Sequence, residues 1–95
     1  MIIKRNIMNR NKKGIKSAAM EAAALWIYHN GEGRLVDIYS QIQTGQGRPF
    51  KRLITKGNLG GKMRGDKRFI VINAGRPDST WGLTQKGVYW VENKA

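Results

Sequence analysis

The sequence predicts an α+β fold in which a three-helix core is followed by a C-terminal β-hairpin. Three observations support this prediction. Apolar residues recur at helical spacing in the first part of the chain, the period becomes extended after Asp66, and a turn-rich segment divides the extended part into two strands. With 95 residues, 40% of them hydrophobic, the chain is long enough for one domain with its own core.

The first helix is expected to follow Ser17, whose hydroxyl suits an N-cap, and to continue through an alanine-rich run. Gly31 and Gly33 are expected to end it, because glycine adopts left-handed backbone conformations at little cost. The face expected to point inward consists of Ala18, Ala22, Leu25 and His29, and Trp26 lies beside this face.

A second helix is predicted by the i, i+3, i+4, i+7 spacing of Leu35, Ile38, Tyr39 and Ile42. It should end before the turn-rich link 44–49. The third segment, 50–64, leaves two interpretations open: a helix from Lys51 interrupted at Gly57, or a later helix from Asn58 to Arg64. We favour the later helix, with Asn58 as its cap and with Leu59 and Met63 directed to the core.

The hairpin is expected to pair Phe69–Ile72 with Trp81–Leu83 across the turn cluster 74–79. The closing run 84–92 fits a strand by propensity, or a short helix capped by Thr84 with Val88 and Val91 inward, and we favour the helix. The residues expected in the core because each falls within an apolar pattern are Trp26, Phe69, Trp81 and Trp90.

Charge is concentrated in two blocks of this chain, whose net charge is +12. Residues 48–68 hold eight cations against one acid, Asp66, and residues 1–16 hold six cations and no acid. Between them, 17–47 carries Arg34 as its one fixed cation. A folded domain with such segregation has a positive face, which is typical of proteins that bind polyanions.

Several classes of function are disfavoured by what the sequence lacks. The absence of cysteine excludes a disulfide framework and cysteine-based zinc fingers, and one histidine, His29, gives little basis for a metal. The six acids are scattered without a catalytic spacing, so we expect no enzyme, no cofactor and no small-molecule substrate. The longest uncharged run near the N-terminus is about half a bilayer span, so we expect no membrane partner and a cytoplasmic, nucleoid-associated protein.

Several runs in the chain carry a resemblance to a known family. These are Ala23-Ala24-Leu25-Trp26, Gly31-Glu32-Gly33 with Val36-Asp37-Ile38-Tyr39, Leu59 to Phe69, and Trp81-Gly82-Leu83-Thr84. They resemble winged helix-turn-helix modules found beside restriction enzymes and RNA polymerase accessory subunits. In those modules the end of the recognition helix and the start of the first wing strand carry two leucines, an aspartate, an arginine and a phenylalanine at fixed spacing. The residues at the corresponding positions here are Leu59, Met63, Asp66, Arg68 and Phe69.

The resemblance covers roughly residues 17–92 and implies a winged-helix domain that binds DNA through its third helix. The glycine-rich third segment departs from the usual helix formers of the family, and winged helices also serve as protein-docking modules. The expected function is therefore double-stranded DNA binding, used in transcriptional regulation or in modulation of host DNA metabolism by a small protein of a phage or other mobile element.

The expected DNA contacts fall into three groups. Phosphate contacts are assigned to Lys51, Arg52, Lys56, Lys67 and Arg68. Base-edge contacts are assigned to Asn58, Lys62 and Arg64, because Asn and Arg have the bidentate geometry for adenine and guanine. Arg76, at the tip of the hairpin, is expected to touch the adjacent DNA backbone.

The first 16 residues are expected to form a basic arm, mobile in the free protein, ahead of a domain at 17–95. On DNA the arm would follow the backbone or a minor groove, and the alternative is a solubilising leader. Its cations are Lys4, Arg5, Arg10, Lys12 and Lys13, together with Lys16. Ile3 and Ile7 fit either a helix that pairs two copies or isolated residues in a tail, so the oligomeric state stays open.

Two alternative functions remain. A protein-docking module would use the same cations on an acidic host partner and would need aromatic anchors, for which Tyr89 and Trp90 are the candidates. An RNA binder is suggested by Gly57-Asn58-Leu59-Gly60, which matches the G-x-x-G loop of KH domains. No strand-forming run leads into that segment, so RNA binding is the weaker alternative.

Overall fold

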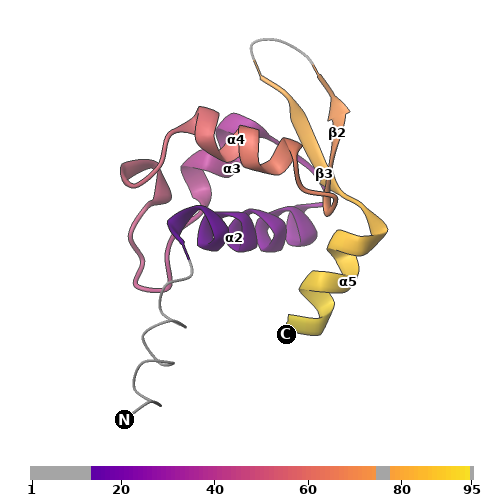
Figure 1. Ribbon diagram of the computed structural model, residues 1–95, viewed down its shortest axis with the longest axis horizontal. Coiled ribbons are helices and arrows are strands. Elements are labelled where there is room, and N and C mark those ends of the chain that lie inside the picture. The colour runs from indigo at the N-terminus through magenta and orange to yellow at the C-terminus, as the bar shows by residue number, and fades with distance from the viewer. Residues whose placement is uncertain (1–13, 75–77, 95) are drawn as a thin grey trace.

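The computed structural model describes residues 14–74 and 78–94. In this part of the chain four α-helices and a three-stranded antiparallel sheet form an α+β fold, which confirms the fold class at that level (Figure 1). Helix α2 runs through the middle of the molecule, with α3 and α4 on one side of it and α5 on the other (Figure 1). The elements follow in the order α2 (Ile15–Asn30), β1 (Gly33–Arg34), α3 (Leu35–Gln41), the 3-10 turn η1 (Phe50–Arg52), α4 (Lys56–Arg64), β2 (Phe69–Asn73), β3 (Thr80–Leu83) and α5 (Gln85–Lys94).

The sheet contains the predicted hairpin and one strand that the sequence did not reveal. Strands β2 and β3 pair antiparallel with Val71 opposite Trp81, so the hairpin prediction is confirmed. The two-residue strand β1 pairs with the other edge of β3, which places Gly33 opposite Trp81 and gives the order β1-β3-β2. The central strand β3 therefore connects β1, which follows α2, to β2, the other strand of the hairpin.

The two glycines expected to end the first helix have different roles. Gly31 follows α2 with φ of 89°, a conformation that favours glycine, as predicted. The prediction for Gly33 was wrong: it is a strand residue, and a Cβ atom there would lie 2.3 Å from the ring of Trp26. Glycine is required at that position because the indole packs directly against the strand backbone.

Helix α2 differs from the prediction at its start and in the face that it buries. It begins at Ile15 after Gly14, so Ser17 lies inside the first turn and is not its N-cap. The predicted inward residues include Leu25, which is 49% exposed, and His29, which is exposed. The residues that enter the core instead are Ala19, Met20, Ala23, Ala24 and Ile27. Because the helix is apolar on almost every side, its spacing could not select the buried face.

Helix α3 and most of the predicted core agree with the sequence pattern. Ile38 and Ile42 are buried, and Trp81 and Phe69 are buried in the same cluster. Trp26 and Trp90 are half-buried and pack against that cluster. Sequence spacing was sufficient to predict the buried residues of α3, because the helix has a single apolar stripe and only that stripe can face the core.

The C-terminal segment is a helix, as favoured from the sequence. The backbone N–H of Gly87 donates to Thr84 Oγ1 at 3.2 Å, and the Thr84 hydroxyl donates to the carbonyl of Lys67 at 2.8 Å. Val91 is buried and Val88 is half-buried. Thr84 therefore caps α5 and also fixes it to the turn that leaves α4.

Candidate nucleic-acid interface

Helix α4 presents one face to the core and the opposite face to solvent. Leu59 and Met63 are fully buried, as predicted, whereas Asn58 and Lys62 are exposed. Thr55 caps the helix through Oγ1, which accepts a hydrogen bond from the backbone N–H of Asn58 at 3.0 Å. The prediction that Asn58 is the cap was therefore wrong, and its side chain lies on the exposed first turn, free to meet a ligand rather than its own backbone.

The helical glycines Gly57 and Gly61 occupy open positions. A Cβ atom at Gly61 would meet nothing within 4 Å, and one at Gly57 would meet Thr55 Oγ1 at 4.0 Å. Gly60 differs, because a Cβ atom there would lie 2.9 Å from Leu35 of α3. Glycine inside a helix costs about 1 kcal/mol relative to alanine. Packing explains Gly60, but nothing in the fold explains the two exposed glycines, which leave the helix backbone bare on its outer face.

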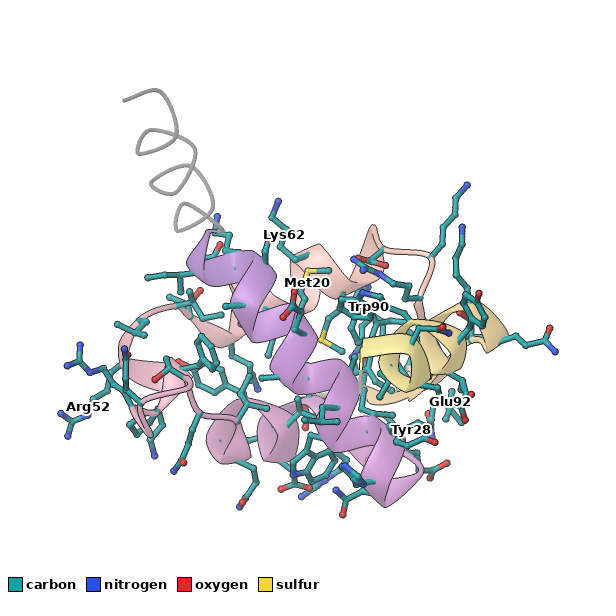
Figure 2. All side chains as sticks on the ribbon, turned by 90° about the horizontal axis from the view of Figure 1, so that it is seen from below. Met20, Tyr28, Arg52, Lys62, Trp90 and Glu92 are labelled. Atoms are coloured by element: carbon teal, nitrogen blue, oxygen red, sulfur yellow. The ribbon has the colours of Figure 1, made fainter. Side chains whose placement is uncertain are left out.

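Exposed cations lie before, on and after α4. Figure 2 shows Arg52 projecting from the η1 end of the molecule and Lys62 projecting beside the first turns of α2. Among residues 14–74 and 78–94, ion pairs hold Arg34, Lys56 and Arg68, and no other cation of the predicted site makes one. We call the following five exposed cations the basic segment: Lys51, Arg52, Lys62, Arg64 and Lys67.

The link between α3 and α4 is held by Tyr39. Its hydroxyl oxygen lies 3.1 Å from the carbonyl oxygen of Lys51 and 2.9 Å from that of Ile54, so its one proton is shared between the two carbonyls. Phe50 is buried in the core beneath the same turn. The backbone that carries Lys51 and Arg52 is thus fixed relative to α4.

Lys56 and Asp78 join the start of α4 to the start of α3. The Lys56 ammonium lies 3.7 Å from Asp78 Oδ1, and Asp78 Oδ2 accepts a hydrogen bond from the backbone N–H of Val36 at 2.9 Å. The next residue, Ser79, accepts from the backbone N–H of Leu35 at 2.8 Å. The side chain of Asp78 is 8% exposed, so its charge depends on these partners. Lys56, expected as a phosphate contact, is engaged within the protein.

Replacing Asp78 with alanine should lower the free energy of unfolding by about 1–3 kcal/mol, because α3 loses its cap and Lys56 loses its partner. Urea unfolding monitored by tryptophan fluorescence would measure the change. The control is Asp37→Ala, which removes a carboxylate from an exposed i, i+3 pair with Arg34 and should change stability little. Equal effects of the two substitutions would contradict the role assigned to Asp78.

Arg68 is half-buried and is engaged by Asp66 and Trp90. Its Nε donates to Asp66 Oδ1 at 2.8 Å, a second guanidinium N–H donates to Oδ2, and the Arg68 backbone N–H donates to Oδ1 at 2.9 Å. The guanidinium carbon lies 3.7 Å from the centroid of the Trp90 ring, a cation–π contact. Arg68 therefore fixes the turn between α4 and β2 to α5, and its guanidinium, expected as a phosphate contact, is engaged within the protein.

The side-chain hydrogen bonds from Arg68 lower the pKa of Asp66 below its ordinary 3.8. Because the folded state favours the carboxylate, this contribution to stability is fully present above pH 3.8 and is lost as the pH falls through the lowered pKa. Asp66→Asn should therefore destabilise the protein near neutral pH, and the deficit should shrink in acid. Unfolding curves of both proteins at several pH values would test this, and a deficit independent of pH would contradict it.

Arg64 ends α4, is exposed, and places its guanidinium carbon 5.8 Å from the centroid of the buried Trp81 ring. Arg76 lies outside the described residues, as do the arm residues Lys4, Arg5, Arg10, Lys12 and Lys13. Lys16, assigned to the arm, lies in the first turn of α2 and is exposed.

Sequence reasoning missed three features of this site. The cap at Thr55 was available from the sequence, because threonine three residues before Asn58 is a common N-cap. The contacts of Asp78 with α3 and of Arg68 with Trp90 join residues that are 42 and 22 positions apart, and no local pattern reveals them.

Comparison of the chain with protein-family models, with curated proteins and with solved structures finds no match. Within residues 14–74 and 78–94 no three His, Asp or Glu side chains are grouped as a metal site would require. In the same residues no helix has both the length and the apolar character needed to cross a bilayer.

Proposed function

We propose that the protein binds double-stranded DNA as a winged helix-turn-helix module, with the outer face of α4 directed at the duplex. The order of the elements supports this proposal: α3, a short link and a capped α4 precede the β2–β3 hairpin, and β1 adds a third strand beside β3. In this arrangement the hairpin, which extends beyond the helices in Figure 1, is the wing.

The observation that carries the proposal is the outer face of α4. It combines exposed Asn58 and Lys62 with bare backbone at Gly57 and Gly61, and cations without ion pairs lie at both ends of the helix. Bare helix backbone allows close approach to a phosphate or a base edge. A surface evolved for solubility would mix charges of both signs, whereas residues 48–68 hold eight cations and one acid, Asp66, which Arg68 engages.

The contacts that we propose follow from this geometry. Asn58, Lys62 and Arg64 read base edges, and Lys51, Arg52 and Lys67 contact phosphates. Arg76 and the N-terminal arm are proposed as further backbone contacts. The protein would act without catalysis, as a small transcriptional regulator or as a modulator of host DNA metabolism encoded by a mobile element, and would associate with the nucleoid.

Titration of a short duplex at several salt concentrations tests the proposal. Each phosphate charge neutralised by Lys or Arg contributes about −0.9 to the slope of log affinity against log salt. The three phosphate contacts, together with Lys62 and Arg64, whose charges also displace counterions when they enter the groove, predict a slope of about −4.5, and contacts from the arm would make it steeper. Fluorescence anisotropy of a labelled duplex gives the affinities. An affinity that does not change with salt would rule out this mode of binding.

A second candidate is docking to an acidic protein, favoured by the aromatic surface of α5. Tyr89 is 68% exposed, and it lines a shallow pocket with Trp90, Lys67 and Lys86. Aromatic side chains beside cations are suited to anchoring a protein partner. Co-purification from nuclease-treated lysate distinguishes the functions, because a stoichiometric protein partner that persists after nuclease favours docking. Single-stranded and duplex RNA as competitors in the DNA titration test the RNA alternative.

A further inference from the structure

Helix α5 carries an exposed aromatic ring among exposed polar residues. One face of the helix holds, at i, i+3, i+4, i+7 spacing, Lys86, Tyr89, Trp90 and Asn93. Together with residues 66–68 of the turn that leaves α4, this face lines a shallow pocket of about 430 Å³, which we call the α5 pocket. Tyr89 is 68% exposed, the highest value for a large apolar side chain in the described residues.

The two aromatic rings of the α5 pocket have different surroundings. Trp90 packs against the core cluster and under the guanidinium of Arg68, and Figure 2 shows it on the side of α5 nearest α2. The backbone carbonyl of Tyr89 accepts a hydrogen bond from the Asn93 amide at 2.8 Å. Within residues 14–74 and 78–94, however, the Tyr89 ring has no aromatic or cationic partner and its hydroxyl makes no hydrogen bond. The ring of Tyr89 is therefore open to a ligand.

The charge around Tyr89 favours an anionic ligand. Lys67 and Lys86 are exposed, and neither takes part in an ion pair with the part of the chain that the structure describes. The acid that lines the α5 pocket, Asp66, is engaged by Arg68. Proteins hold single-stranded nucleic acid with this combination, because a base stacks on the aromatic ring while neighbouring phosphates pair with the cations.

We propose that the α5 pocket binds an unpaired base of a DNA strand that extends beyond the duplex at α4. Tyr89 is the stacking platform, and Lys67 and Lys86 contact the phosphates of the extension. This inference rests on the proposed function, because Lys67 follows the end of α4 by three residues and also belongs to the basic segment. The Thr84 hydroxyl, which donates to the Lys67 carbonyl at 2.8 Å, fixes the start of α5 to that turn. The duplex surface and the α5 pocket are thereby held side by side.

The shape of the α5 pocket favours a base over the anchor side chain of an acidic protein. Side chains that dominate protein–protein affinity fill well-packed pockets from which water is excluded. The α5 pocket is shallow, and the ring of Tyr89 is largely exposed. A base needs only one open ring face, and every base can stack on it. The extension should therefore be bound with little regard to its sequence.

Fluorescence anisotropy with matched duplexes tests this proposal. A blunt duplex is compared with the same duplex carrying a short thymidine extension, placed on the 3′ end and on the 5′ end in turn. At least one extension should tighten binding by about tenfold, as expected when one base stacks on an aromatic side chain. An extension of abasic sites keeps the phosphates without the bases, and should tighten binding much less. No gain from either thymidine extension, or an equal gain from the abasic one, would overturn the proposal.

Two substitutions of Tyr89 assign the gain to its ring. Tyr89→Ala should abolish the gain from the thymidine extension while binding the blunt duplex as the unsubstituted protein does, which also shows that the variant is folded. Tyr89→Phe keeps the ring without the hydroxyl and should retain the gain. A gain that persists in Tyr89→Ala would overturn the proposal.

The outcomes also separate this inference from the function on which it rests. Tight binding of the blunt duplex with no gain from an extension overturns the α5 pocket alone, whereas failure to bind any duplex overturns both. Amide shifts at Lys86 and Tyr89 with an aspartate-rich peptide that contains phenylalanine, and none with the extended duplex, would assign the pocket to an acidic protein. That result would also overturn the proposal.

Discussion

Replacing Lys62 and Arg64 with glutamine is expected to lower the affinity for duplex DNA by on the order of fiftyfold at about 0.1 M salt. Both residues are exposed on α4 and make no ion pair within the described chain. Each lost counterion-releasing contact costs about eightfold at that salt concentration, and the log–log salt slope should become less negative by about 2. Anisotropy titrations at several salt concentrations measure both quantities.

The matched control is Arg34→Gln with Lys86→Gln, which removes one arginine and one lysine from β1 and α5. It changes the net charge equally but leaves the proposed interface intact. We expect a loss of a few-fold, from weaker long-range attraction, and a nearly unchanged slope. If both double variants lost the same affinity and slope, DNA would be attracted by net charge, and the assignment of the interface to α4 would be wrong.

Two helical glycines are expected to respond to alanine in opposite ways. A Cβ atom at Gly87 would lie 2.2 Å from the carbonyl oxygen of Arg68, so α5 would have to move away from the end of the α4–β2 turn. We expect Gly87→Ala to destabilise the protein by about 1–3 kcal/mol or more, as overpacking does in other cores. Gly61→Ala meets open space and should stabilise α4 by up to about 1 kcal/mol.

The pair also tests why Gly61 is present. Urea unfolding gives the two stability changes, and equal signs would contradict the packing described for Gly87. The more stable Gly61→Ala protein should nevertheless bind duplex DNA less tightly, because a methyl group would stand on the face that approaches the duplex. If the Gly61→Ala protein were more stable but bound duplex DNA with unchanged affinity, Gly61 would not belong to the proposed interface.

Local patterns in the sequence were sufficient for the elements that have one apolar face. Leu35 and Ile38 lie in α3, Ile42 follows its last residue, and Thr84 marks the start of α5. The hairpin followed from the change to β-branched residues after Asp66 and from the turn cluster before Trp81. In each of these elements the spacing of apolar residues is compatible with a single secondary structure, so the prediction from the sequence agrees with the fold.

The sequence was insufficient where two structures fit the same pattern or where partners are distant. The apolar residues of α2 allow either face to be buried, and the choice depends on which elements pack against it. Lys56 and Arg68 look like other cations of the basic block until Asp78, Asp66 and Trp90 are placed beside them. Six of the predicted contacts remain exposed, and their contact with DNA remains a prediction: Lys51, Arg52, Asn58, Lys62, Arg64 and Lys67.

The central claim is that the outer face of α4 meets double-stranded DNA, and an amide-shift titration of the ¹⁵N-labelled protein with a short duplex tests it most directly. The account predicts saturable shifts centred on Gly57, Asn58, Gly61 and Lys62, with smaller shifts at Lys51 and Lys67. The amides of Leu25 and Tyr89 should stay in place. Absence of shifts at α4, or shifts centred on Tyr89 and Trp90 of α5, would contradict it.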